Sequence, residues 1–152
     1  MPNTFTRAEN FDAYHFIRVG FFNSGTTLMF FPMPGAEDMR EVTSSTGAGE
    51  RLSFLFPFDG SVETIWARSE YASGSTVIRT YIGTTAIEVP SAIGGTAVTV
   101  DMSVDDTSYE FDFAGGGSNT FSQGNILMFS VIPTTQLGDC HFMIVLKFDT
   151  ST

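Results

Sequence analysis

The sequence predicts an all-β protein: a single-domain, antiparallel β-sandwich. Apolar and polar residues alternate with a period of two in several segments, most cleanly over 98–104. Hydrophobic residues make up 42% of the chain, with 16 Phe and 15 Gly but only 16% charged residues, which suits packed sheets joined by tight turns better than amphipathic helices. No segment carries apolar residues at helical spacing. A chain of 152 residues is one domain, long enough to bury a real core.

The N-terminal third begins with a polar, irregular segment, 1–12, which we expect to be an arm, leaving 13–152 for the sandwich. Segment 14–22 predicts a strand whose two faces alternate: Tyr14, Phe16 and Arg18 on one, and His15, Ile17, Val19 and Phe21 on the other. A second strand is expected over 26–31, ended by Pro32. The polar stretch 32–50 is the longest connection in the chain, and long loops are often functional.

Regular strand signals begin after residue 51. A strand is expected over 52–58, with Leu52, Phe54, Phe56 and Phe58 along one face. Pro57 should end it, and Asp59-Gly60 should supply the turn conformation. Strands over 62–70 and 76–82 follow, joined by a turn at 73–75. Ile65 and Ala67 should lie opposite Trp66 and Arg68, and a short strand is expected over 86–89.

The C-terminal half continues the pattern. In segment 96–104 we expect Val98, Val100, Met102 and Val104 to point inward. Asp105-Asp106 should turn the chain into a strand over 109–113. Segments 125–132 and 140–148 are apolar on both faces, so both faces should be covered, one by the core and the other by a second subunit or by loops. This succession of short strands and turns indicates a sandwich or jelly roll.

Residues that could carry chemistry are few. His15 and His141 each lie in an apolar strand without the ligand spacing of a metal site, so partly buried strand histidines are expected. Carboxylates are dense in one hairpin and could bind calcium, but a solvated outer face is favoured; they are Asp101, Asp105, Asp106, Glu110 and Asp112. No catalytic signature is found. We therefore expect no enzymatic activity, no cofactor and no metal.

Aromatic residues and the single cysteine have structural interpretations. Trp66, Tyr71 and Tyr81 could form a sugar-binding platform, but core or interface positions are favoured. Cys140 excludes an intrachain disulfide and is expected to be a small core residue.

The net charge of −10 disfavours direct nucleic-acid binding. No signal peptide is expected at the N-terminus. The apolar runs fall short of the ~18 residues of a membrane helix, so no membrane partner is expected either.

A resemblance narrows the class further. Residues 54–82 combine a strand, the Pro-Phe-Asp-Gly corner, a second strand, the Ser-Gly-Ser turn and a third strand. This order of strands and turns resembles that of small jelly-roll virion structural proteins of tailed phages, especially marine and cyanobacterial ones. The resemblance extends over roughly the last two thirds of the chain.

The resemblance implies a capsid decoration, or cement, protein that binds and stabilises the outside of the head. It further implies a homotrimer, the major capsid protein as partner, and a place in the virion after assembly in the host cytoplasm. Because no fibre shaft is expected, head decoration is favoured, with 1–12 and 32–50 reaching the shell. The alternative is a fibre-tip module that binds a host receptor or glycan. A cupin-like enzyme is the weakest alternative, because its His/Glu cluster is missing.

Overall fold

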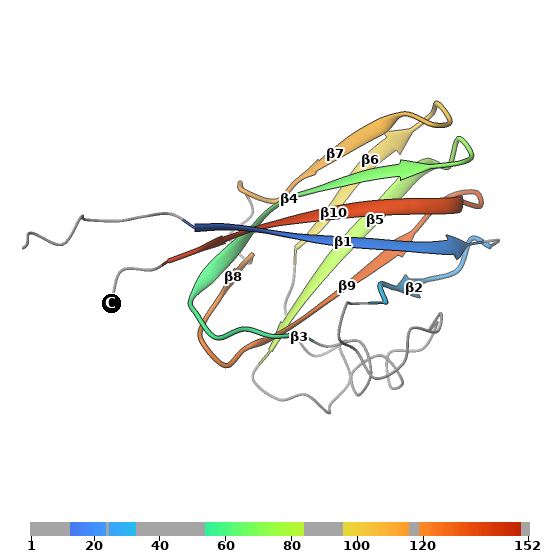
Figure 1. Cartoon of the computed structure of the whole chain (residues 1–152). Helices are drawn as coiled ribbons and strands as arrows, with labels where there is room; N and C mark the ends of the chain where they lie inside the picture. The colour runs from blue at the N-terminus through green and yellow to red at the C-terminus, as the bar shows by residue number, and fades with distance from the viewer. Residues whose placement is uncertain (1–12, 24, 33–53, 84–95, 116–118, 150–152) are drawn as a thin grey trace, which may run out of the picture.

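The computed structural model describes residues 13–23, 25–32, 54–83, 96–115 and 119–149. These residues form two antiparallel sheets that face each other (Figure 1). Sheet A has the order β1-β10-β4-β7, with β8 also pairing with β4, and contains β1 (Ala13–Asn23), β10 (Gly138–Phe148), β4 (Gly60–Ser69), β7 (Ser108–Asp112) and β8 (Thr120–Phe121). Sheet B has the order β2-β9-β5-β6, with β3 also pairing with β9, and contains β2 (Met29–Phe30), β9 (Ile126–Ile132), β5 (Gly74–Gly83), β6 (Ala97–Met102) and β3 (Phe54–Leu55). The described residues include no helix that could cross a membrane.

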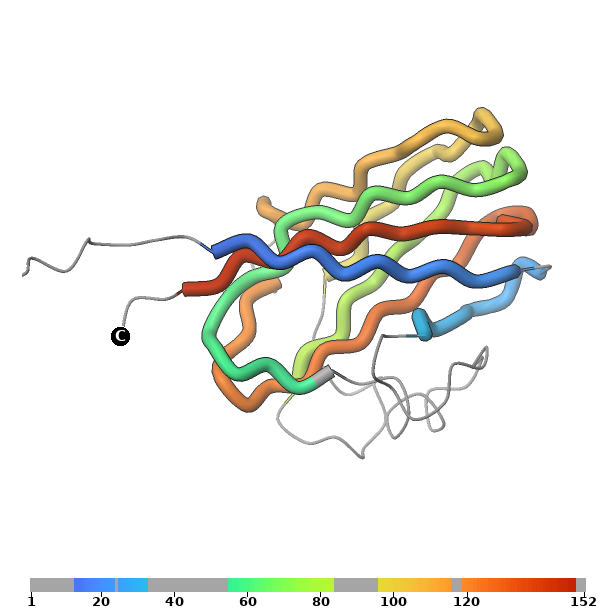
Figure 2. The backbone as a smooth tube through the Cα atoms, viewed as in Figure 1, coloured from blue at the N-terminus to red at the C-terminus, as the bar shows by residue number. Residues whose placement is uncertain are grey.

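The order of the strands defines a jelly roll. The chain changes sheet between β1 and β2, between β3 and β4, between β4 and β5, between β6 and β7, between β8 and β9, and between β9 and β10. As a result, strands far apart in sequence become neighbours, and β1 lies beside β10 along its whole length (Figure 2). Two sheets built this way from interleaved Greek keys are a jelly roll. The predicted all-β jelly-roll sandwich is therefore confirmed.

The core lies between the sheets and is rich in phenylalanine. Ile65 and Ala67 of β4 face inward, whereas Trp66 and Arg68 face outward, as their alternation predicts. Phe31 lies at the centre of the aromatic packing, because its ring is 4.4 Å from Phe142, 5.7 Å from Phe21 and 6.0 Å from Phe129. The first two of these neighbours belong to sheet A and the third to sheet B, so this ring links the two layers.

Several predicted elements are shorter than expected. Of the strand expected over 26–31, only Met29–Phe30 pairs with β9. Of the strand expected over 52–58, residues 52 and 53 lie outside the described residues, and among 54–58 only Phe54–Leu55 pairs with β9. Phe56 is buried whereas Phe58 is 51% exposed, so the two do not share a face, because the chain bends at the intervening Pro57. Val104 was expected inside but is exposed, since β6 ends at Met102 and the turn begins there. The segments 1–12, 33–50 and 86–89 lie outside the described residues.

The Pro57–Gly60 corner is held by its aspartate. The Asp59 carboxylate accepts the Gln123 N–H at 2.6 Å, and the Asp59 carbonyl accepts the Asp149 N–H at 2.9 Å. Gly60 is not among the glycines with positive φ, so the expectation that it provides a turn conformation is wrong. Glycine is needed because a Cβ there would collide with the Lys147 carbonyl and lie 2.8 Å from the Phe121 ring.

Replacing Gly60 should therefore destabilise the fold. We expect Gly60→Ala to lower the free energy of unfolding by about 1–3 kcal/mol, the usual cost of forcing extra atoms into a packed site. Gly115→Ala is the matched control, because a Cβ there meets nothing within 4 Å, and it should change stability by less than about 0.5 kcal/mol. Urea denaturation of both variants measures the difference. Equal stabilities would show that the corner can relax.

Candidate docking face

The outer face of sheet A brings together side chains from four strands. One row across the sheet joins Arg18, Met143, Trp66 and Glu110, and the next joins Gly20, His141, Arg68 and Ser108. All residues of these two rows except Glu110 line an open depression of about 640 Å³. We call this surface, from β1 to β7, the docking face.

Basic groups gather on the docking face. Arg18, Arg68 and Lys147 lie on it, which is three of the four Lys and Arg residues in the described part of the chain. Arg68 is paired with Asp106 at 3.1 Å, but both side chains are exposed, so the pair contributes little to stability. No hydrogen bond or ion pair joins Arg18 to another described residue. Its guanidinium is therefore free to bind an external acceptor.

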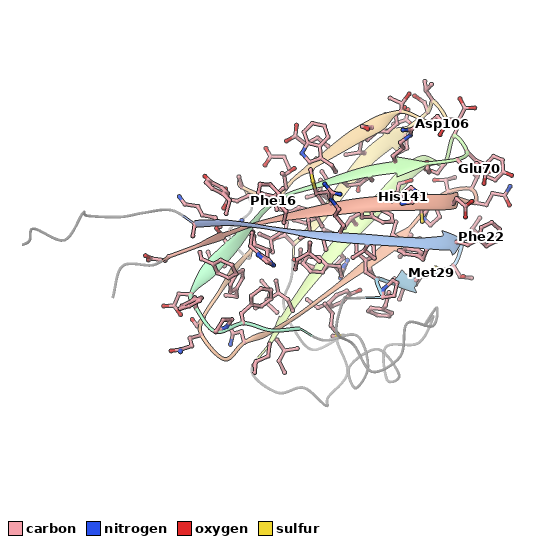
Figure 3. All side chains as sticks on the ribbon, in the orientation of Figure 1. Phe16, Phe22, Met29, Glu70, Asp106 and His141 are labelled. Atoms are coloured by element: carbon pink, nitrogen blue, oxygen red, sulfur yellow. The ribbon has the colours of Figure 1, made fainter. Side chains whose placement is uncertain are left out.

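The imidazole of His141 leans toward β1. A Cβ added at Gly20 would lie 3.0 Å from the Nδ1 atom of His141, so glycine at this position leaves room for the ring. His141 is exposed and lies between Gly20 and Arg68 in its row. Figure 3 shows it on β10 beside β1.

Large aromatic side chains are also exposed on this face. Tyr14, Phe16 and Phe22 of β1 are more than half exposed, and Trp66 of β4 is 37% exposed. Phe16 and Phe22 lie at separate points along β1 (Figure 3). Exposed apolar side chains that cluster on one surface mark interaction sites. Aromatics, Met and Arg are also the residues enriched at the centres of protein interfaces.

The two histidines do not form a site. Both were expected to be partly buried, but both are exposed, so that expectation is wrong. His141 points outward from β10, and His15 lies where all residues from Ala13 to Phe16 are exposed. In the β1–β10 pair, His15 is opposite Leu146 while His141 is opposite Gly20, so the histidines are in separate rows. Among the described residues, no three His, Cys, Asp or Glu side chains are grouped to hold a metal ion.

The carboxylates of the predicted hairpin are dispersed. Asp101 is on β6 of sheet B, whereas Glu110 and Asp112 are on β7 of sheet A. All five carboxylates are exposed. Asp106 adopts a left-handed turn conformation, with a φ of 52°. The exposure of these five carboxylates agrees with the sequence interpretation that favoured a solvated outer surface.

The three aromatics considered as a sugar platform lie apart. Trp66 is on the docking face, Tyr71 follows β4, and Tyr81 is buried on the outer face of sheet B. Tyr81 packs there with Phe30 and Met128, and its hydroxyl is 3.0 Å from the Ser130 hydroxyl. Tyr81 is therefore buried, as favoured from sequence, whereas Trp66 and Tyr71 are exposed and an interface position for them stays a prediction. Met128 shows that the second face of β9 is partly covered within the chain, which weakens the argument for a subunit there.

Cys140 is buried, as expected, and its thiol donates to the Phe21 carbonyl at 3.0 Å. The sequence interpretation missed the grouping of Arg18, Arg68 and His141. Each lies at an outward position of its strand, which is the only local signal. The grouping becomes visible only when β1, β10 and β4 are known to be neighbours.

Comparisons with known proteins give structural neighbours only. No protein-family model matches the chain, and no curated protein matches it. A two-module piece of Clostridium thermocellum xylanase 10B, with CBM22-1 and GH10 modules, is 7% identical with a TM-score of 0.37, over 89% of this chain and 26% of that one. A family two carbohydrate esterase from Cellvibrio japonicus is 11% identical with a TM-score of 0.31, over 93% and 35%. A chain of the empty cowpea mosaic virus particle is 12% identical with a TM-score of 0.37, over 95% and 86%.

The chain thus spans about a quarter and about a third of the two carbohydrate-active proteins, and most of the viral one. Viral capsid proteins and carbohydrate-active proteins are both among its neighbours. Likenesses this distant carry no argument about function, and the jelly-roll assignment rests on the strand order above.

Proposed function

We propose that this chain is a virion structural protein, a decoration protein that binds the major capsid protein on the outside of a tailed-phage head. The observation that carries the proposal is the docking face, where the exposed aromatics of β1 lie on the same surface as Trp66, Met143 and the unpaired Arg18. Jelly rolls serve as capsid and lectin domains, but a fold alone does not define a function. The surface, rather than the fold, therefore supports the proposal.

The docking face is large enough for a specific interface. Four strands spaced ~4.8 Å apart make it about 19 Å wide, and the 11 residues of β1 extend it to about 36 Å. This corresponds to on the order of 700 Å², close to the ~800 Å² that each partner contributes to a standard interface. Trp and Arg side chains dominate the binding energy of such interfaces, and here Trp66 and Arg18 lie in one row, with Arg18 midway along the edge strand β1.

A decoration protein stabilises the shell because its binding is coupled to the conformational state of the shell. A protein that binds only the expanded shell stabilises that state by mass action. A β-sandwich suits this task because it presents a fixed surface. The net charge of −10 keeps such a protein away from the packaged genome, since like charges repel.

A second candidate is a receptor- or glycan-binding module at a fibre tip. The observation that favours it is the open depression beside Trp66, because an aromatic ring can stack on a sugar and a guanidinium can bind its polar groups. Both candidate functions use the docking face. In the first it binds the major capsid protein, and in the second it binds a receptor or a glycan.

Charge reversal on opposite sheets tests the proposal. Arg18 on the docking face and Arg79 on the outer face of sheet B are both exposed arginines, so Arg18→Glu and Arg79→Glu make the same change in net charge. Wild-type and variant protein are added to phage heads lacking the decoration protein, and occupancy is measured by gel densitometry and cryo-electron microscopy. We expect Arg18→Glu to weaken binding by about tenfold or more, as loss of an energetically important interface arginine does, and Arg79→Glu to bind normally.

Two results would contradict the decoration proposal. If both variants occupy heads like the wild type, the docking face does not contact the capsid. If the wild type does not bind heads but does bind a glycan on an array, and Arg18→Glu loses that binding, the fibre-tip candidate replaces the decoration protein.

A further inference from the structure

The edges of the two sheets differ in how they are protected. The last strand on each side of a sheet presents unpaired N–H and C=O groups, and natural proteins block such edges with charges, short strands or bulges. In the described part of the chain, sheet A ends in β1 on one side and in β7 and β8 on the other. Sheet B ends in β6 on one side and in β2 and β3 on the other.

Three of these edges are blocked. The β7 edge carries the exposed carboxylates of Glu110 and Asp112, and the β6 edge carries that of Asp101. Strands β2 and β3 contain two residues each. Since one copy of the chain carries a net charge of −10, acidic edges repel a second copy, and two-residue strands offer it too few hydrogen-bonding groups.

The β1 edge has no carboxylate, is not short and contains no bulge, and its one charged residue is Arg18. Strand β1 contains 11 residues and pairs with β10 without a register shift from Ala13 to Asn23. Every second residue of such a strand points its N–H and C=O groups away from its partner, and no hydrogen bond joins this side of β1 to another described residue. The strand contains no Asp, Glu, Lys or Pro and only one Arg. It is therefore the part of this acidic chain least repelled by another copy.

The first residues of β1 are also exposed on both faces. Ala13, Tyr14, His15 and Phe16 are all exposed although they pair with β10. Figure 1 shows β1 running along the margin of sheet A, with its labelled neighbour β10 on one side. A long, exposed and largely apolar edge strand is a template for adding another strand.

We infer that β1 pairs antiparallel with β1 of a second copy, so that sheet A continues across a two-fold axis. A pairing centred on Arg18 would place two guanidinium groups opposite each other, and like charges directly opposite are destabilising. Because Ala13 to Phe16 are exposed on both faces, we place the axis toward the N-terminal end of β1, where Arg18 faces the partner's Tyr14 or the partner's Phe16. An Arg over an aromatic ring is favourable.

This pairing goes beyond the proposed function and does not depend on it. Main-chain hydrogen bonds and the outward side chains of β1 would join the copies, leaving the outward side chains of β10, β4 and β7 free, so the docking faces of two copies would form one continuous surface. The two-fold symmetry differs from the homotrimer implied by the sequence resemblance, and one measurement of mass distinguishes the two.

The test is the oligomeric state of the purified full chain. Light scattering and sedimentation from dilute to concentrated solution should show twice the mass of one chain. Phe16→Lys adds a positive charge beside Arg18 at an exposed position, so the dimer dissociation constant should rise about tenfold or more. Leu55→Lys, at a position 66% exposed on β3, is the matched control and should remain a dimer. Circular dichroism checks that both variants fold.

Hydrogen exchange distinguishes edge pairing from packing of side chains. In the dimer, the β1 amides that point away from β10 should exchange more slowly at high protein concentration, and in Phe16→Lys this protection should disappear. A monomer at all concentrations, a trimer, a dimer unaffected by Phe16→Lys, or a dimer without new protection in β1 would each overturn the inference. None of these results depends on binding to phage heads.

Discussion

Phe31→Ala is expected to lower the free energy of unfolding by about 3–5 kcal/mol, the range for removing a fully buried phenylalanine. Phe31 has no exposed surface, and its ring is packed between Phe21 and Phe142 of sheet A and Phe129 of sheet B. Both sheets would have to move inward to close the cavity. Because each sheet is held by its own ladder of hydrogen bonds, we expect little relaxation. Urea denaturation monitored by circular dichroism measures the change.

Phe58→Ala is the matched control for this prediction. It removes the same atoms from a side chain that is 51% exposed, and its ring contacts Phe148 at 5.9 Å. It should cost about 1 kcal/mol or less, as substitutions outside the core usually do. If Phe31→Ala costs no more than Phe58→Ala, the aromatic centre is not the main contact between the two sheets.

Local patterns predicted most of the strands. The alternation over 62–70 correctly assigned Ile65 and Ala67 to the core and Trp66 to the surface. The pattern failed where the chain leaves a strand. Phe56 and Phe58 are two residues apart, yet the bend at Pro57 separates them, and Val104 lies just beyond the last paired residue of β6. Period-two alternation holds only while a strand remains in its ladder.

The docking face could not be predicted from the sequence. Arg18, Arg68 and His141 are far apart along the chain, and only the order β1-β10-β4 makes them neighbours. Nothing local in β1 indicates that β10 will pair with it, because this pairing closes a loop of more than one hundred residues. The exposure of His15 also depends on the tertiary arrangement of the strands. His15 belongs to the first four residues of β1, which are all exposed although they pair with β10.

The two outer faces of the sandwich differ in a way that bears on function. On sheet B, Phe30, Tyr81 and Met128 are buried in a second apolar cluster. On sheet A, Tyr14, Phe16 and Phe22 remain exposed. Exposing large apolar side chains in water is unfavourable, so the exposed set is better explained by a partner than by the stability of the isolated chain. This asymmetry is why sheet A, and not sheet B, is proposed to contact the capsid.

Asn119→Asp is expected to lower the free energy of unfolding by about 3–5 kcal/mol, comparable to leaving a buried charge without a partner. Asn119 is 5% exposed, and its side-chain amide donates to the carbonyls of Val62 and Phe113, both at 2.8 Å. An aspartate would replace both donors with an anion facing two carbonyl oxygens. Burial would raise the pKa of this introduced carboxyl in the folded state, so the variant should be least destabilised at low pH and lose stability as the pH rises above about 4.

Asn125→Asp is the control for this prediction. The Asn125 side chain accepts the Ser122 N–H through its oxygen, and aspartate also provides an oxygen there, so this variant should change stability by less than about 0.5 kcal/mol. Urea titrations across pH compare the two variants, and equal losses would show that the donated hydrogen bonds of Asn119 do not hold β4 to the segment between β7 and β8.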